Sequence, residues 1–307
     1  RPDLDAVYME AVQMLTGSGG WPMTVFLTPE GKPFYGGTYF PPVDRHNMPG
    51  FPRLLESVAG SYHNNRSEID RVTGQITEQM GRTAHMPKTG AKLGDGSIHT
   101  AYSALATNFD YQNGGVGGAP KFPQAMTLEV LLRYYAHGHN DRALEMLELT
   151  LQKMAQGGIY DQIAGGFHRY STDTYWLVPH FEKMLYDNAL LARLYINAHQ
   201  ATGRGMYRRI AEETLDYVLR EMTGPHGGFF SATDADSEGE EGKFFVWTPD
   251  EIESVLGSEE APIFSGFFGV TKDGNFEGQN ILNIPENATE ALPVYPVQLF
   301  EASADFF

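Results

Sequence analysis

The N-terminal residues carry apolar positions that recur with the period of an α-helix. Between residues 3 and 16 these positions share one helical face. They are Leu4, Val7, Tyr8, Ala11, Val12 and Leu15. Three of the next four residues, at 17–20, are glycine, which tolerates backbone angles that a helix does not adopt. The sequence therefore predicts a helix that ends at residue 16.

The pattern then changes to that of β-strands. Residues 23–27 and 34–39 are short runs rich in β-branched and aromatic side chains. Between them, Thr28-Pro-Glu-Gly-Lys32 supplies the proline and glycine of a tight turn. We therefore predict a β-hairpin that Pro22 opens, with a cis peptide bond between Trp21 and Pro22.

Helical periodicity dominates most of the remaining chain. Residues 51 to about 80 are predicted to be mostly helical and amphipathic, with Leu54, Leu55 and Val58 on one side. Residues 82–96 are polar and rich in glycine and lysine, so we interpret them as a linker. Further helices are predicted near 97–108, 125–137, 141–156, 180–202 and 205–222.

The pattern changes again near the C-terminal end. Residues 229–247 contain two aromatic runs around an acidic turn, which predicts a second β-hairpin. Thr248-Pro-Asp-Glu251 then predicts a helix start. Threonine caps backbone N–H groups, proline fits the first turn, and the glutamate completes a capping box.

A Gly-Gly-apolar signature recurs in the loops between the helices. It occurs at Gly114-Gly115-Val116, Gly157-Gly158-Ile159, Gly165-Gly166-Phe167 and Gly227-Gly228-Phe229. The recurrence indicates a repeat of helical hairpins whose glycines let the backbone approach a central cavity. The alternative is that each pair only ends a helix.

Length and composition narrow the class of protein. The 307 residues suggest two domains or one large one, and 41% hydrophobic residues suffice for a core. A net charge of −17 argues against nucleic acid or an anionic membrane as partner, because both repel an acidic surface. No apolar run reaches about 18 residues, so we expect no membrane span. A neutral or cationic small ligand fits better, and the oligomeric state stays open.

The chain contains no cysteine. Disulfides, thiolate metal sites and cysteine catalysis are therefore excluded within it. The absence fits a reducing compartment, and we expect a cytoplasmic protein. The first residues do not resemble a signal peptide, and the chain does not begin with methionine, so we expect a fragment or a processed form.

The strongest candidate site lies between residues 161 and 187, which mix imidazoles, aromatic rings, carboxylates and cations. If a helix begins near residue 179, His180, Lys183 and Asp187 share one face. His180 in the first turn and His168 on the preceding loop would form an acid/base pair across a sugar carbon. The candidate binding residues, among them stacking rings, are Arg169, Tyr170, Trp176, Glu182, Lys183 and Asp187. The structural alternative is that these groups cap backbone, form ion pairs or fill a core.

A second candidate is the acidic segment at 233–241. Its carboxylates lack the spacing of an EF-hand calcium loop. Asp234 or Asp236 opposite Asp161 would give the two carboxyl groups, roughly 5–10 Å apart, that a glycosidase needs. We expect Asp234 and Asp236 to face the cavity and residues 238–241 to face solvent. The alternative is a hydrated hairpin tip.

Two further patterns carry less chemistry. The glycine-rich segment 113–123 fits neither the P-loop nor the dinucleotide fingerprint, so we interpret it as a cavity-lining loop with Lys121 as a polar contact. His137 and His139 flank one glycine at a helix end, and a metal needs more convergent ligands. We therefore predict neither a metal nor another cofactor.

Several segments together resemble one known family. Residues 19–42 (Gly-Gly-Trp-Pro-Met-Thr-Val-Phe-Leu and onward) resemble the thioredoxin-like domain of the spermatogenesis-associated protein 20/YyaL family. Phe167-His-Arg-Tyr-Ser, Pro179-His-Phe-Glu-Lys-Met-Leu-Tyr-Asp-Asn188 and Ala232-Thr-Asp-Ala-Asp-Ser237 resemble its second domain. The resemblance covers nearly all of residues 1–285.

The resemblance implies a mainly α fold. The C-terminal half of a thioredoxin-like α/β domain (1–81) would precede a linker (82–96) and the N-terminal part of an (α/α) toroid (97–307). The toroid is similar to six-hairpin glycosidases and N-acylglucosamine 2-epimerases. The family's upstream Cys-His-Trp-Cys motif is absent here, and Pro22 would match its structural cis-proline.

Three functions remain open from the sequence. The favoured one is sugar epimerisation or isomerisation through His168 and His180. Glycoside hydrolysis through Asp161 and Asp234 competes with it, and Asp236 and Lys121 would contact substrate in either case. The third is a non-catalytic module that binds a sugar or a protein beside a thioredoxin-like scaffold.

Overall fold

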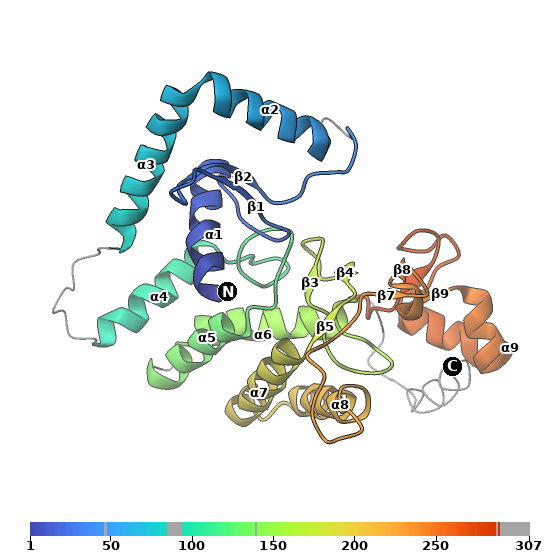
Figure 1. Cartoon of the computed structure of the whole chain (residues 1–307). Helices are drawn as coiled ribbons and strands as arrows, with labels where there is room; N and C mark the ends of the chain where they lie inside the picture. Colours follow the sequence, from blue (N-terminus) through green and yellow to red (C-terminus); the bar gives the residue numbers. More distant parts are fainter. Residues whose placement is uncertain (46–47, 85–93, 139, 287, 289–307) are drawn as a thin grey trace. The chain divides into compact units, whose positions relative to one another are not determined.

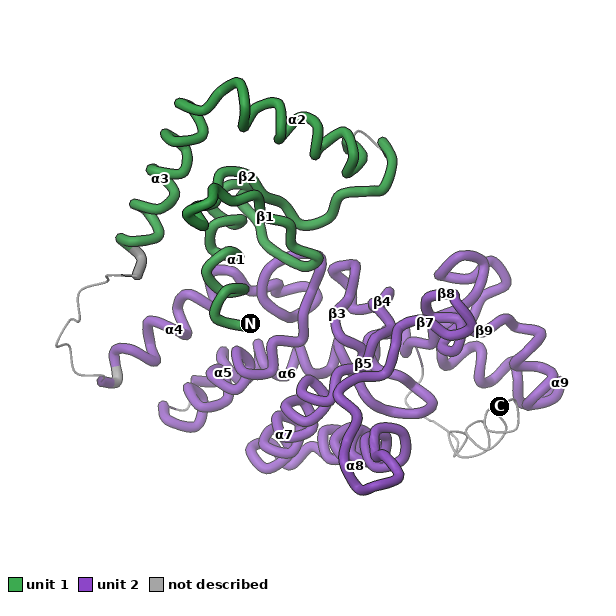
Figure 2. Tube along the Cα trace, in the orientation of Figure 1, with its two compact units in different colours: residues 1–92 green, residues 93–307 purple. Residues whose placement is uncertain are grey.

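The computed structural model describes residues 1–45, 48–84, 94–138, 140–286 and 288. The chain divides into two units, Arg1–Lys92 and Leu93–Phe307, shown in different colours in Figure 2. Both units are mainly helical, which confirms the predicted fold class. The predicted linker largely lies outside the described residues, although helices occupy its two ends, at 82–84 and 95–96.

The described residues of unit 1 form three helices and one hairpin. Helix α1 (Pro2–Thr16) precedes the antiparallel strands β1 (Thr24–Leu27) and β2 (Pro33–Gly37), which confirms the predicted helix and hairpin. The peptide bond between Trp21 and Pro22 is cis, as expected. Helix α1 packs on β2, and Gly36 allows the close approach, because a Cβ there would lie 3.1 Å from Val12 of α1.

The helical segment predicted at 51–80 is confirmed. It forms two helices, α2 (Phe51–Asn64) and α3 (Arg66–Ala84), and α3 also contacts β2. Asn65 interrupts them with φ −122° and ψ 43°, and its carbonyl accepts the N–H groups of Glu68 and Ile69 at the start of α3. Asparagine favours such local alternatives to helical bonding, which accounts for the break between the two helices.

Unit 2 is built from helices that pack in sequential pairs. Helix α4 (Asp95–Thr107) contacts α5 (Ala125–Gly138), α5 pairs with α6 (Asp141–Gln156), and α7 (Leu185–Thr202) pairs with α8 (Gly205–Glu221) (Figure 1). The largest core lies among these helices and includes the fully buried Leu131, Leu147, Leu191 and Tyr195. The helical-hairpin prediction is therefore confirmed for α5–α6 and α7–α8.

The helix predicted at 180–202 begins later, at Leu185. The residues before it are extended: β4 (Pro179–His180) pairs with β3 (Tyr170–Ser171), and β5 (Lys183–Met184) pairs with β6 (Ala232–Thr233). The shared helical face of His180, Lys183 and Asp187 therefore does not exist. Pairing with a segment about fifty residues away overrides the local helical pattern, and periodicity cannot reveal such a partner.

The hairpin predicted at 229–247 is also largely wrong. Only its acidic tip is a hairpin, β7 (Asp236–Ser237) with β8 (Glu240–Glu241), where Glu238 and Gly239 adopt the positive φ angles of a tight turn. The second aromatic run forms β9 (Val246–Trp247), which pairs with β10 (Asn280–Ile281). Helix α9 (Pro249–Phe267) then begins with the predicted capping box of Thr248 and Glu251.

The Gly-Gly pairs do not share one structural role. A Cβ on Gly158 would collide with the carbonyl oxygen of Leu177 and with Ile281, so only glycine fits there. A Cβ on Gly228 would meet nothing within 4 Å. The pair at 157–158 therefore allows close backbone packing beside the cavity described below, whereas the pair at 227–228 lies in an uncrowded turn.

These two glycines give a matched test of the packing. Replacing Gly158 by alanine should lower the free energy of unfolding by about 2 kcal/mol or more, because backbone atoms must move. Gly228→Ala should change it by less than about 0.5 kcal/mol. Urea denaturation of both variants measures the difference, and equal values would contradict the packing described here.

Candidate functional site

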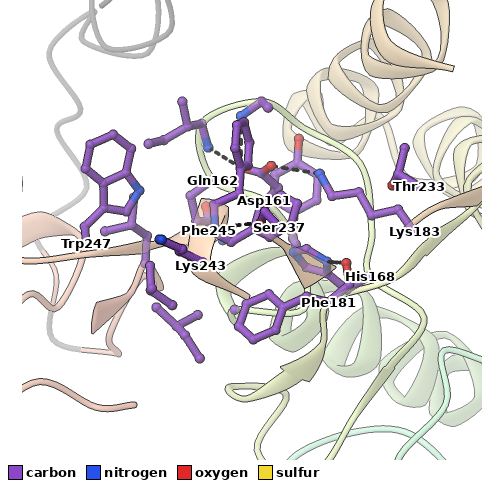
Figure 3. Close-up of a pocket in the computed structure, with 18 of the residues that line it drawn as sticks. Asp161, Gln162, His168, Phe181, Lys183, Thr233, Ser237, Lys243, Phe245 and Trp247 are labelled. Atoms are coloured by element: carbon purple, nitrogen blue, oxygen red, sulfur yellow. Dashed lines mark hydrogen bonds and ion pairs between the residues drawn. The ribbon is translucent and has the colours of Figure 1, made fainter. Parts of the chain in front are cut away.

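A cavity of about 550 Å³ opens in unit 2, between the loop that joins α6 to α7 and the segment from β6 to α9 (Figure 3). The first wall holds Asp161, His168 and Lys183. The second holds Asp234, Asp236 and a set of aromatic side chains. The aromatic lining residues are Tyr160 and Phe181 from the first wall, Phe244, Phe245 and Trp247 from the second, and Tyr217 from helix α8. The size and the mixed lining are typical of small-molecule sites.

The first wall contains a buried ion pair. Asp161 Oδ2 lies 2.7 Å from Lys183 Nζ, and the two side chains are 9% and 1% exposed. Asp161 Oδ1 accepts the backbone N–H groups of Ile163 and Ala164. Lys183 also donates to the carbonyl of Gly165, at 2.9 Å. Both oxygens of the carboxylate are therefore engaged before any ligand arrives.

The surroundings of the pair fix its charges. Burial alone would raise the pKa of Asp161, but the Lys183 ammonium and the backbone donors outweigh it and hold the pKa below its ordinary value. Burial lowers the pKa of Lys183, and Asp161 offsets part of that effect. The ammonium also lies over the rings of Tyr217 and Phe245, at 4.3 and 5.0 Å from their centroids.

His168 is a neutral imidazole at the cavity wall. Its ring makes T-shaped contacts with the rings of Phe181 and Phe245, with centroids 5.4 and 4.7 Å away, and the residue is 1% exposed. Nδ1 donates to the carbonyl oxygen of Phe181 at 2.9 Å, which leaves Nε2 as a hydrogen-bond acceptor. Burial, with the nearby Lys183 ammonium, lowers the pKa of His168 to about 3. Within the described part of the chain, Nε2 has no hydrogen-bond partner.

The acidic hairpin contributes more to the cavity than the sequence suggested. Asp234 and Asp236 line it, as expected, and Asp234 Oδ1 accepts the N–H of Asp236. The side chain of Glu238 is 73% exposed, as expected, but it also borders the cavity and pairs with Lys243. Glu241 at the other side of the hairpin binds His180 instead.

Several predicted site residues lie elsewhere. The side chain of His180 stacks on Tyr170 and contacts Glu241 at 2.6 Å, and Arg169 pairs with Glu182 at 2.7 Å. None of these five lines the cavity, and neither does Asp187, whose pKa burial raises to about 6. Of the two imidazoles predicted to face one substrate, only His168 reaches this cavity, because His180 lies on a strand rather than in a helix.

Two other predicted contacts are core residues. Trp176 is 0% exposed and its Nε1 donates to the carbonyl of Asn113, so its ring cannot stack on a ligand. Lys121 is 1% exposed and pairs with Asp110 at 2.6 Å, which occupies its charge. Lys121 therefore does not act as the predicted polar contact in this cavity.

Sequence reasoning missed the aromatic half of the cavity. Tyr160 and Tyr217 were not singled out, and Phe245 and Trp247 were assigned only to a strand. Tyr160 donates to Glu213, and the Tyr217 hydroxyl bonds to that of Thr233 at 3.1 Å. The one sequence signal was a run of aromatic residues, Phe244 to Trp247, next to a predicted acidic turn.

The described residues do not meet the requirements of a metal site or of a membrane-spanning helix. No three side chains of His, Asp or Glu converge as metal ligands there. None of the described helices combines the length and apolar character that a membrane crossing needs.

The chain is similar in sequence to one known family. A family model described as "Thioredox_DsbH: Protein of unknown function, DUF255" matches residues 1–81. Human spermatogenesis-associated protein 20 is 38% identical over 92% of this chain, and the mouse protein gives the same identity and coverage. The resemblance to this family is confirmed. The chain spans about two fifths of these relatives' length, since it covers 40% of each.

Solved structures give a weaker likeness. A cellobiose 2-epimerase from Spirochaeta thermophila DSM 6192 overlaps 46% of this chain and 41% of its own, with 21% identity and a TM-score of 0.39. A sugar epimerase from a ruminal bacterium overlaps 54% and 51%, with 14% identity and a TM-score of 0.41. Overlaps of this extent carry no argument about what the cavity does.

The ion pair can be tested through stability. Asp161→Asn should cost about 3–5 kcal/mol, because it leaves the Lys183 ammonium buried without its counter-charge. Adding Lys183→Met should recover part of that loss, since the double variant buries no lone charge. Glu212→Gln, which breaks the exposed pair with Arg208, should cost less than about 1 kcal/mol. Similar losses from Asp161→Asn and Glu212→Gln would contradict a buried pair.

His168 should make stability depend on pH. Its folded pKa of about 3 lies below the ordinary 6.5, so the unfolded state takes up the proton first as pH falls. The contribution of the neutral imidazole to the free energy of unfolding is complete above pH 6.5. It is lost as the pH falls from 6.5 to 3, at about 1.4 kcal/mol per pH unit.

His168→Asn keeps a donor for the Phe181 carbonyl but removes the titrating group. Urea denaturation at a series of pH values should therefore show a shallower loss for this variant than for the parent chain. His226→Gln, at an exposed histidine, should leave the slope unchanged. Identical slopes for the parent and the His168 variant would show that the imidazole is not held neutral.

Proposed function

We propose that unit 2 binds a carbohydrate in this cavity and that His168 is its central hydrogen-bond acceptor. The observation that carries the proposal is a buried neutral imidazole whose free nitrogen borders a cavity walled by aromatic rings. A sugar presents hydroxyl donors at its rim and C–H groups on its faces. An acceptor between aromatic side chains matches both parts of such a ligand.

The accessible position of His168 Nε2 supports a ligand. The residue is 1% exposed, yet its Nε2 is not one of the described side-chain atoms that are both fully buried and without a partner. Nε2 of His168 borders open space rather than packed side chains, so water or a ligand hydroxyl can satisfy it. A hydroxyl that replaces this water gains a fixed acceptor, and the surrounding rings exclude further water.

Proton transfer is a second candidate, because the Nε2 lone pair of His168 is free to take a proton. A base with a pKa of about 3 is weak, however, and general bases work best when their pKa is close to the working pH. The partner base predicted for a two-base epimerase, His180, does not line the cavity. The geometry therefore favours binding over epimerisation.

Hydrolysis through Asp161 and Asp234 has less support. A general acid needs a raised pKa, whereas the pKa of Asp161 is lowered, and both of its oxygens already accept hydrogen bonds. An attacking carboxylate would have to give up Lys183 first.

Binding and catalysis separate in one set of experiments. Saturation-transfer NMR with hexoses and their β-linked disaccharides should detect saturable binding to the 307-residue chain. His168→Asn should weaken it about tenfold, the loss expected for one hydrogen bond of about 1.4 kcal/mol. His226→Gln should bind as the parent does. If no sugar in the panel binds, or if the His168 variant binds as well as the parent, the proposal fails.

The same samples in deuterated water test the proton-transfer candidate. If His168 is the base, the sugar C2 proton should exchange with solvent in the parent chain and in His180→Asn. The exchange should be lost in His168→Asn. Binding without exchange identifies a binding site.

A further inference from the structure

The charges that line the cavity are unbalanced. Among its described lining residues, the cations are Lys183 and Lys243, and His168 is neutral. The carboxylates are more numerous: Asp161, Glu221, Asp234, Asp236, Glu238 and Glu251. A ligand therefore enters a negative potential, which aromatic walls of low polarity strengthen.

Neither cation is available to an anionic ligand. Lys183 is held by Asp161 and the carbonyl of Gly165, and its remaining direction faces the rings of Tyr217 and Phe245. Lys243 pairs with Glu238. A phosphate or carboxylate on a ligand would have to break one of these pairs while it met the other carboxylates.

Two of the carboxylates have no counter-ion. Asp234 and Asp236 form no ion pair with any described cation, and the side chain of Asp234 accepts only a backbone N–H, that of Asp236. Glu221, by contrast, pairs with Arg220, and Glu251 accepts the capping bonds of Thr248. The uncompensated charge of the cavity is thus concentrated on β7 and the residues just before it.

The free acceptor of His168 is an independent sign that the cavity takes a ligand, and it is compatible with an ammonium donor. The residue is 1% exposed and lines the cavity, and its Nε2 can only accept a hydrogen bond while the ring is neutral. An ammonium group offers three donors and no acceptor. Phe244 and Trp247 also line the cavity, and aromatic rings can attract a cation.

We propose that the cavity prefers an amine-bearing carbohydrate, an amino sugar in its ammonium form, to a neutral sugar, and that it rejects phosphorylated sugars and sugar acids. Asp234 and Asp236 supply the counter-charge. The inference rests on the proposed function, because it names the class of carbohydrate that the same cavity takes. Both carboxylates are exposed, so the preference is modest: roughly fivefold, the size of an ion pair of about 1 kcal/mol near a protein surface.

Matched pairs of ligands test the preference. Isothermal titration of the 307-residue chain compares glucose with glucosamine, galactose with galactosamine and mannose with mannosamine at neutral pH. At least one amine should bind roughly fivefold tighter than its hydroxyl partner, and added salt should reduce the ratio. N-acetylation, which removes the charge but keeps the nitrogen, should abolish the advantage. The corresponding 6-phosphates should bind more weakly than the neutral sugars.

Isosteric variants assign the effect to the hairpin. Asp234→Asn with Asp236→Asn should bring the ratio of amine to hydroxyl affinity close to one while the neutral sugars still bind. The control is Glu240→Gln with Glu253→Gln, two exposed carboxylates outside the cavity lining that change the net charge equally. This control should keep the ratio of the parent chain.

The outcomes separate the two proposals. Equal binding of amines and their hydroxyl partners, or tighter binding of the phosphates, overturns the charge preference and leaves carbohydrate binding intact. A preference that persists in the Asp234/Asp236 variant overturns the role of the hairpin. If no sugar of either kind binds, both the preference and the proposed function are wrong.

Discussion

The ion pair between Asp161 and Lys183 is the constraint on which the cavity depends. It joins the loop after α6 to β5, and β5 in turn pairs with β6, so one buried contact connects both walls. Burial lowers the pKa of His168, and the ammonium of the pair lowers it further, while the carboxylate accepts backbone N–H groups of the turn that leads to Gly165. Because the two charges neutralise each other, neither is available to a ligand. His168 and the carboxylates of the acidic hairpin are the polar groups that a ligand can contact.

Elements whose partners are close in sequence were predictable. The hairpin of β1 and β2, the pairs α5–α6 and α7–α8, and the capping box at Thr248 all follow from local patterns. The errors have a different origin. The extended segment before Leu185 and the strand at 246–247 form by pairing with residues far along the chain, and their own side chains favour other structures just as well.

The same distinction explains the site. Asp161, His168, Lys183, Asp234 and Asp236 were found from their chemistry, and all of them line the cavity. His180 was placed opposite His168 only because a helix was assumed around it. Trp176 and Lys121 were read as ligand contacts because aromatic and charged residues suggest binding, yet burial and the Asp110 carboxylate assign them to the core. Composition identifies such groups, but only packing decides which way they face.

The most direct test is the nitrogen NMR signal of His168 Nε2 in the chain labelled with ¹⁵N-histidine. In the free chain at neutral pH, a signal of the unprotonated, acceptor type is expected. Titration with a sugar that binds should shift this signal saturably, with the affinity measured by calorimetry, while Nδ1 stays protonated. A protonated Nε2 in the free chain, or a signal that a bound sugar leaves unmoved, would contradict the role given to this imidazole.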